Sequence, residues 1–135
     1  MAESMLEYGR RMLSAQAFSV MVGAKLDAWS EGLAELSLEL RPEHLQQHGI
    51  VHGGVIAYLA DNALAFAGGS RLGDVVTLEF KINFIKPARG ELLVARARVV
   101  SAGKSQAVCH CEVFAEEGAD VTLCAAAQGT IWKAG

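Results

Sequence analysis

One carboxylate lies in the middle of a long apolar segment, and this combination constrains the chain more than any other feature. Nearly every residue between Val55 and Ala67 is apolar, and Asp61 is the only charged one among them. Burying a charge is costly unless it is paired or hydrogen-bonded, so Asp61 needs a partner or a purpose. Carboxylates in such surroundings are candidates for catalysis, although structural ion pairs share the same signature. We therefore expect the function of this chain to depend on Asp61.

The residues on either side of this segment are typical of helix ends. Residues 52–54 read His-Gly-Gly, and a helix that begins there leaves unpaired backbone N–H groups pointing outward. Residues 68–69 are both glycine, a common C-terminal stop. We predict a helix from about Gly54 to Ala67. Because this helix is apolar nearly all round, we expect a curved sheet and a second subunit to cover it.

The rest of the chain has the alternation and turn signals of strands. After Asp74, the residues Leu78, Phe80, Ile82 and Phe84 alternate with polar residues, which predicts that these four share one face of a strand. The predicted fold class is α+β, with a six-stranded antiparallel sheet wrapped around one central helix, as a single domain over residues 1–135. The other expected elements are a short helix over residues 4–16, strands over residues 18–28 and 33–41, a loop over residues 42–53, and strands over residues 92–101, 105–115 and 121–132.

Composition and charge exclude several classes of protein. The chain is 52% hydrophobic and 20% charged, which is typical of a globular protein. No apolar run reaches the roughly 20 residues of a membrane-spanning helix, and the first residues lack the features of a signal peptide. We expect a cytoplasmic protein without a membrane partner. The net charge of −3, with scattered basic residues, argues against nucleic acid as a partner.

The three cysteines do not suggest a disulfide framework. Cys109, Cys111 and Cys124 make an odd count without the spacing of a known pattern. Cys109 and Cys111 would share one face of a strand, with His110 on the other face. We interpret the cysteines as small buried apolar residues of a reducing compartment.

The order of elements resembles the hotdog fold, and residues 49–61 resemble the signature of PaaI-type acyl-CoA thioesterases. This family includes phenylacetic acid degradation and 4-hydroxybenzoyl-CoA thioesterase-like proteins. Its pattern is a His-Gly-Gly loop with an Asp nine residues after the His, as in His52 and Asp61. The resemblance continues through residues 83–88 and the Gly103-Lys104 turn, and covers roughly residues 30–132. It implies a thioester hydrolase that releases a free acid and coenzyme A and needs no cofactor, because coenzyme A is part of the substrate.

The resemblance also implies roles for individual residues. The Gly53 N–H is the expected donor to the oxyanion, and His52 shapes the thioester pocket. Asp61 is the general base or the nucleophile, two roles that the sequence does not distinguish. Thr77 lies where the family often has a Ser or Thr that orients water or the carboxylate, although it is equally consistent with an ordinary strand residue. Gln46 lies where the family usually has Asn.

Gln46 is one methylene longer than that Asn, which changes the reach of its amide, and Gln47 would replace it if the loop shifts. For substrate binding, Gly54 has no Cβ to block the thioester. The residues that we expect to bind the coenzyme A phosphates are Lys86, Arg89 and Lys104.

The spacing of Asp61 from the helix start predicts a dimer. Asp61 lies seven residues after Gly54, which separates them by about 10 Å along a helix. Catalytic contacts are about 3 Å long, so one chain cannot easily supply both groups to one carbonyl. If two such helices pack antiparallel across a two-fold axis, Asp61 of one subunit faces Gly53 of the other. We expect a homodimer with two composite sites, assembled further as a dimer of dimers, a homotetramer.

Three other functions are alternatives to thioester hydrolysis. His44, His48 and His52 have the spacing of metal ligands on a helix, but the proline and glycines around them argue against a helix, so no metal is expected. A hotdog hydratase or dehydratase uses a His as acid and base, in motifs such as His-Phe-Pro-Gly that this sequence lacks. A non-catalytic acyl-CoA binder would keep the glycine loop without needing Asp61.

The acyl group is expected to be aryl or medium-chain, and a carrier-protein thioester is an alternative to coenzyme A. The aromatic residues that line an acyl pocket under this hypothesis, or otherwise belong to the core, are Tyr58, Phe66, Phe80 and Phe84.

Overall fold

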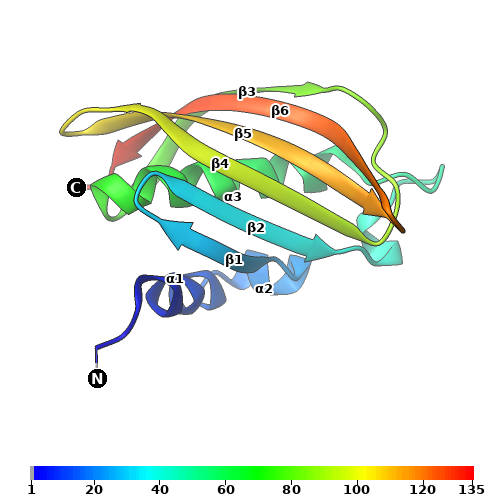
Figure 1. Cartoon of the computed structure of the whole chain (residues 1–135), viewed down its shortest axis with the longest axis horizontal. Helices are drawn as coiled ribbons and strands as arrows, with labels where there is room; N and C mark the ends of the chain where they lie inside the picture. Colours follow the sequence, from blue (N-terminus) through cyan, green and yellow to red (C-terminus); the bar gives the residue numbers. More distant parts are fainter. Residues whose placement is uncertain (1) are drawn as a thin grey trace.

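A six-stranded antiparallel sheet curves around one long helix, α3 (Figure 1). The computed structural model describes residues 2–135. The strand order is β1-β2-β4-β5-β6-β3, so β1 and β3 are the sheet edges. The predicted fold is confirmed. The elements are α1 (Met5–Ser14), α2 (Ala17–Val22), β1 (Lys25–Ser30), β2 (Leu33–Glu39), η1 (Pro42–His44), α3 (Gly53–Leu72), β3 (Val75–Phe84), β4 (Leu92–Ala102), β5 (Gln106–Glu117) and β6 (Asp120–Lys133).

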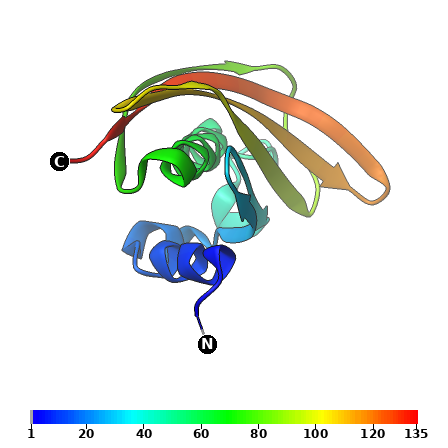
Figure 2. The ribbon, with the colours of Figure 1, turned by 60° about the vertical axis from the view of Figure 1, so that its left-hand side comes forward.

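The core lies between α3 and the concave face of the sheet (Figure 2). Leu59 and Leu64 of α3 are fully buried against sheet residues such as Leu36 and Leu93. Alternate residues of β5 also point inward, among them Cys109 and Cys111. All three cysteines are free and buried, which confirms the interpretation that they are small core residues.

The predicted strand over residues 18–28 is half wrong, because its first part is the helix α2. Phe18, Val20 and Val22 look like strand residues, but Gly23 ends a helix there in the left-handed conformation, with φ +98°. The Arg41 side chain donates hydrogen bonds to the carbonyls at the end of α2. This tertiary contact outweighs the weak strand propensity of the segment.

The central helix is longer than predicted, because the glycine pair does not end it. It begins at Gly53 and continues to Leu72, where Gly73, with φ +88°, follows. A Cβ on Gly68 would lie 2.7 Å from the Ile131 side chain of β6. Gly68 is therefore a point of close approach between helix and sheet, and not a stop signal.

A β-bulge in β3 changes the alternation that was expected there. The register of β3 against β6 shifts between Thr77 and Glu79. Phe80 and Ile82 pack against the core as predicted, whereas Leu78 and Phe84 are 57% and 56% exposed. The prediction of a common face is therefore wrong for Leu78, which the bulge turns to the other face. Phe84 shares the face of Phe80 and Ile82, and a Cβ on Gly53 of α3 would lie 3.5 Å from its ring. The bulge leaves Thr77 directed toward α3, which matters for the site below.

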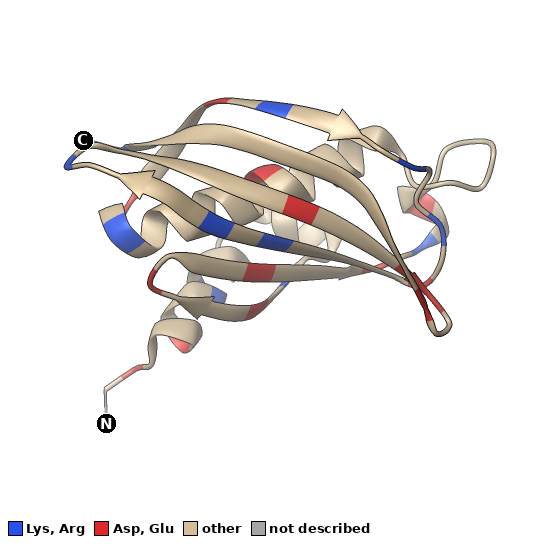
Figure 3. Ribbon diagram, turned by 45° about the horizontal axis from the view of Figure 1, so that its top comes forward, with Lys and Arg blue, Asp and Glu red and all other residues tan. Residues whose placement is uncertain are grey.

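The outer surface of the sheet carries charges of both signs side by side (Figure 3). For example, Arg96 of β4 forms an ion pair with Glu35 of β2 at 3.5 Å. Among residues 2–135, no helix combines the length and the apolar character needed to cross a membrane.

Candidate active site

Asp61 is held by a hydrogen bond from the neighbouring strand. The Thr77 hydroxyl of β3 donates to Asp61 Oδ1 at 2.7 Å, and both residues are half-buried. Within residues 2–135 the second carboxylate oxygen, Oδ2, accepts no hydrogen bond. Thr77 thus fixes the orientation of the carboxylate and leaves one oxygen free to take a proton or to attack a carbon. The structure brings these two predicted site residues together.

A cavity of about 190 Å³ opens beside Asp61. Phe18 and Ser19 of α2, Tyr58 of α3 and Thr77 contribute to its wall. Burial raises the pKa of Tyr58; the hydrogen bonds with Ser19 and Asn62 oppose this rise, and the nearby charge of Asp61 adds to it. Tyr58 is therefore a neutral hydroxyl at pH 7 and donates to Ser19 Oγ at 2.6 Å.

His52 closes the start of α3 as its N-cap. Its Nδ1 accepts the Gly54 N–H at 2.8 Å, which assigns the proton of a neutral ring to Nε2. A Cβ on Gly54 would lie 3.0 Å from this ring, so the cap itself favours glycine at that position. The Gly53 N–H, by contrast, has no acceptor among the described residues. Of the two glycines, Gly53 is the one whose N–H remains available to a ligand.

Gln46 and Lys86 lie at the same end of α3 as Gly53. These three residues and Phe84 line one cavity of about 310 Å³. Gln46 is therefore placed with the helix start and not with Asp61. The predicted site residues fall into two groups within one subunit, one around Gly53 and one around Asp61.

The two groups are too far apart to act on one carbonyl. Gly53 and Asp61 belong to the same continuous helix, and eight residues of rise separate them by about 12 Å. A substrate carbonyl that accepts from Gly53 therefore cannot also reach Asp61 of the same chain.

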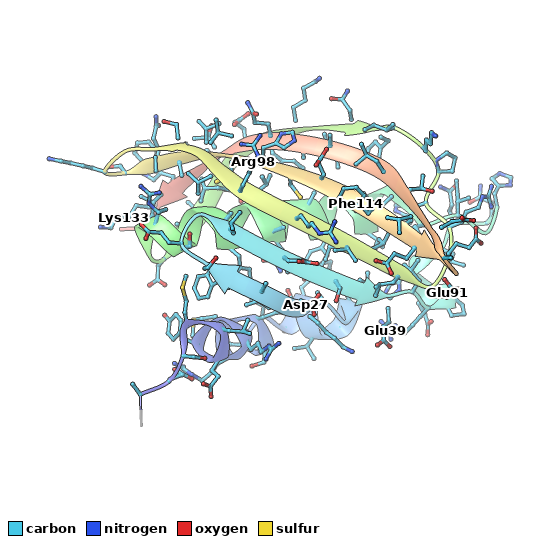
Figure 4. All side chains as sticks on the ribbon, viewed as in Figure 1. Asp27, Glu39, Glu91, Arg98, Phe114 and Lys133 are labelled. Carbon is cyan, nitrogen blue, oxygen red and sulfur yellow. The ribbon has the colours of Figure 1, made fainter. Side chains whose placement is uncertain are left out.

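The three basic residues expected to bind phosphate do not meet within one subunit. Lys86 and Arg89 lie between β3 and β4, whereas Lys104 lies in the β4–β5 turn, and all three are exposed. The eleven residues of β4 separate these two ends of the sheet by about 30 Å. In Figure 4 the labels Glu91 and Lys133 mark the two ends.

Among residues 2–135, the cysteine and histidine side chains form no second reaction centre. Burial raises the pKa of the Cys109 thiol to about 11 and that of Cys111 to about 12, so both are protonated and unreactive at pH 7. His44 is buried, with its Nε2 2.8 Å from the Val22 carbonyl oxygen, and His52 is the helix cap. Within residues 2–135, no three His, Cys, Asp or Glu side chains gather as a metal site would require.

Two polar residues near Asp61 were missed from the sequence. Ser19 was hidden because its segment was interpreted as a strand, and it belongs to α2. Asn62 follows Asp61 directly and donates to the Tyr58 hydroxyl at 3.0 Å. Asn62 could have been identified from the sequence, because it is a second polar residue within an otherwise apolar helix.

Comparison with known proteins identifies the family. A family model described as the thioesterase superfamily matches residues 48–122, more than half of the chain. The chain belongs to the thioesterase superfamily. The matched region contains His52, Gly53, Asp61 and Thr77. Thioester hydrolysis is thus the class of reaction of this enzyme.

Relatives of this thioesterase agree with that assignment. A putative esterase of Archaeoglobus fulgidus is 33% identical over 114 residues, 84% of this chain and 72% of that protein. The acyl-coenzyme A thioesterase PaaI of Escherichia coli is 29% identical over 113 residues, 83% of this chain and 81% of that protein. The solved structure of the E. coli PaaI protein aligns with a TM-score of 0.85 at 26% identity, over 94% of this chain and 91% of that one.

A thioesterase family protein from Silicibacter pomeroyi superposes with a TM-score of 0.88 at 30% identity, over 91% of this chain and 93% of that one. The resemblance to PaaI-type thioesterases that the sequence indicated is confirmed.

Proposed function

We propose that this thioesterase hydrolyses an aryl or medium-chain acyl-CoA at two composite sites of a homodimer. The observation that carries the proposal is the state of Asp61: Thr77 holds one carboxylate oxygen at 2.7 Å and the other is free. The free Gly53 N–H at the start of the same helix supplies the second requirement, a donor for the oxyanion.

The chemistry follows from these two groups. Asp61 of one subunit removes a proton from water as the water attacks the thioester carbonyl, or its own oxygen attacks first and the acyl-enzyme is hydrolysed afterwards. The carbonyl oxygen gains charge and accepts the Gly53 N–H of the other subunit, where the helix dipole favours an anion. The C–S bond then breaks, the sulfur leaves with the electron pair, and a proton converts it to the thiol of coenzyme A. No cofactor takes part.

The exposed edge of the sheet supports the dimer. β3 has one neighbour in the sheet, so its other edge presents unpaired backbone groups. Val76, Leu78 and Phe84 expose more than half of their surface along it. A second copy pairing antiparallel with this edge would cover these side chains and place the two α3 helices antiparallel. The sites would then combine Asp61 of one subunit with Gly53 of the other, and a dimer of dimers remains our expectation for the full assembly.

The same antiparallel pairing supports the predicted phosphate ligands. Lys104 lies at the end of the sheet where β3 begins, and Lys86 lies at the end where β3 stops. Antiparallel subunits bring opposite ends of their sheets together, so Lys104 of one subunit would join Lys86 and Arg89 of the other. Three cations from two chains would then face the phosphates of coenzyme A.

Thiol release from a panel of acyl-CoA substrates tests the proposal. We expect turnover by the wild type and a loss of about 10²–10⁴-fold in kcat for Asp61→Asn, which keeps the acceptor for Thr77 but removes the base. Wild-type activity in Asp61→Asn would refute the catalytic role. Binding without thiol release would instead identify an acyl-CoA binder, and hydration of an enoyl-CoA without thiol release would identify a hydratase. A carrier-protein thioester in the panel tests that alternative.

A matched pair of variants tests the oxyanion donor. Gly53 is the first residue of α3, where proline fits a helix, and His52 has the extended backbone (φ −62°, ψ 133°) that a following proline requires. Gly53→Pro therefore removes the N–H without breaking the helix, and Gly53→Ala keeps it. We expect Gly53→Pro to lower kcat by about 10²–10³-fold more than Gly53→Ala. Equal effects of the two variants would exclude the N–H as the donor.

A further inference from the structure

A third cavity, of about 230 Å³, lies between α1 and the C-terminal half of α3. It exists because α1 packs against β1 and leaves space between itself and α3. We call this cavity the chamber. The residues that line it are Tyr8, Met12, Gln16, Trp29, Asn62, Ala65, Phe66, Gly69, Gly73, Asp74 and Val75.

The aromatic walls of the chamber are fixed in place. The Trp29 indole N–H donates to the Phe66 carbonyl at 2.7 Å. The Trp29 ring meets the Phe66 ring edge-on, with centroids 5.4 Å apart, and lies roughly parallel to the Tyr8 ring at 6.3 Å. Trp29 is thus positioned by both helices at once, and the aromatic wall of the chamber is preformed.

The chamber adjoins the cavity beside Asp61. Gln16, Asn62 and Ala65 line both. Asp61, Ala65 and Gly69 follow one another at four-residue intervals on α3, so they lie near one face of the helix and span about 12 Å. A chain attached to a carbonyl beside Asp61 would run along this face of α3, past Ala65, to reach the chamber.

Hydrogen bonds fix the polar side chains where the two cavities meet. Ser19 Oγ donates to Gln16 Oε1 at 2.6 Å, and the Tyr58 hydroxyl donates to Ser19 Oγ at 2.6 Å. Asn62 Nδ2 donates to the Tyr58 hydroxyl at 3.0 Å. These bonds join α2 and the segment before it to α3, so the polar side chains between the two cavities are held in place.

We propose that the chamber binds the acyl tail of the substrate and that Ala65 and Gly69 set the longest tail accepted. This inference rests on the proposed function. An apolar cavity of about 150 Å³ is enough for a benzene ring, so the chamber has room for a single ring or a medium-length chain. The small side chains at Ala65 and Gly69 keep the path open where it passes α3.

The charge of the lining narrows the substrate class further. Among the described residues that line the chamber none is basic, and Asp74 is acidic. A carboxylate at the far end of the acyl group would meet no cation and one like charge. The chamber therefore selects uncharged apolar tails over tails that end in a carboxylate.

A series of acyl-CoA substrates of increasing length tests the chamber. For the wild type, kcat/KM should rise by about fourfold per methylene until the chamber is filled. Gly69→Leu should lower kcat/KM for octanoyl-CoA relative to butyryl-CoA by about tenfold or more. Ala65→Leu, nearer to Asp61, should move the cut-off to still shorter chains. Ala119→Leu, in the exposed β5–β6 turn, is the matched control and should leave the length profile unchanged.

One result of this series would refute binding of the acyl tail in the chamber. If Gly69→Leu lowered kcat/KM equally for every chain length, the tail would not enter it. If Gly69→Leu failed to fold, Gly69→Ala provides a milder test, because its Cβ would lie 3.6 Å from Val75, an ordinary contact.

Binding of octanoate separates this inference from the proposed function. The chain has two tryptophans, so Trp132→Phe leaves Trp29 as the sole indole. Octanoate should then change the Trp29 fluorescence saturably, and Gly69→Leu should weaken that response. No saturable response would refute the chamber, whether or not the enzyme hydrolyses acyl-CoA. A wild type that binds octanoate but releases no thiol would refute the proposed function and keep the chamber.

Discussion

Two adjacent glycines of α3 should respond in opposite ways to the same substitution. An alanine Cβ at Gly68 would lie 2.7 Å from both Cβ and Cγ2 of Ile131, which is fully buried on β6. Carbon atoms prefer separations of about 3.5–4.0 Å, so helix and sheet must separate by close to an ångström. Such overpacking costs about 1–3 kcal/mol. At Gly69 the nearest atom to the new Cβ is Val75 Cγ2 at 3.6 Å, and nothing has to move.

Both substitutions also gain about 0.5–1 kcal/mol, because alanine is the better helix residue. Gly69→Ala should therefore be stabilised by that amount, and Gly68→Ala should lie about 1–3 kcal/mol below it. For a chain of this length, 1 kcal/mol shifts Tm by about 4 °C, so thermal unfolding followed by circular dichroism resolves the pair. Ile131→Val keeps the three crowding carbon atoms and should not rescue Gly68→Ala. Equal Tm values for the two glycine variants would refute the argument of close approach.

Three further predictions concern the site and the core. Thr77→Val should lower kcat by about 10–100-fold, because it removes a hydrogen bond to the charged Asp61, and Thr77→Ser should restore kcat. Equal kcat values for the wild type and Thr77→Val in steady-state kinetics would exclude the positioning role. His52→Ala should cost about 0.5–2 kcal/mol of stability through loss of the helix cap, and His52→Asn should recover the free energy of unfolding measured in urea. The pKa values of about 11 and 12 for Cys109 and Cys111 lie above the value of about 8.5 for an unfolded thiol. At high pH the folded state therefore binds more protons than the unfolded state. Stability should be constant below about pH 8.5 and then fall by up to about 1.4 kcal/mol per pH unit for each thiol, a slope that a double alanine variant should lack.

Much of the fold could be predicted because its signals are local. The alternation of the later strands and the long apolar helix follow from side-chain periodicity, which depends on neighbours in the chain. The exceptions depend on tertiary contacts. From sequence alone, Gly68 has the pattern of a helix C-terminus, but in the structure it packs closely against Ile131 within the helix. Residues 18–22 have the pattern of a strand, but in the structure they form a helix whose last carbonyls accept hydrogen bonds from Arg41.

The candidate site divides in the same way. The separation of Gly53 from Asp61 follows from their spacing along one helix, so the proposal of a second subunit could be made from the sequence. The direction of Thr77 depends on a bulge that periodicity does not reveal. The chamber depends on how α1 packs, and the distance between Lys104 and Lys86 depends on the topology of the sheet. Neither the chamber nor the distance between these two lysines can be predicted from neighbouring residues in the sequence.

The central claim is that each active site takes Asp61 from one subunit and Gly53 from the other. Asp61→Asn and Gly53→Pro each inactivate a homodimer under this account. In a heterodimer of the two variants, isolated with two different affinity tags, one site carries both defects and the other carries none. The account predicts about half of the wild-type rate of thiol release from that heterodimer. If the heterodimer is as inactive as its parents, both groups act within one chain and the composite site is wrong.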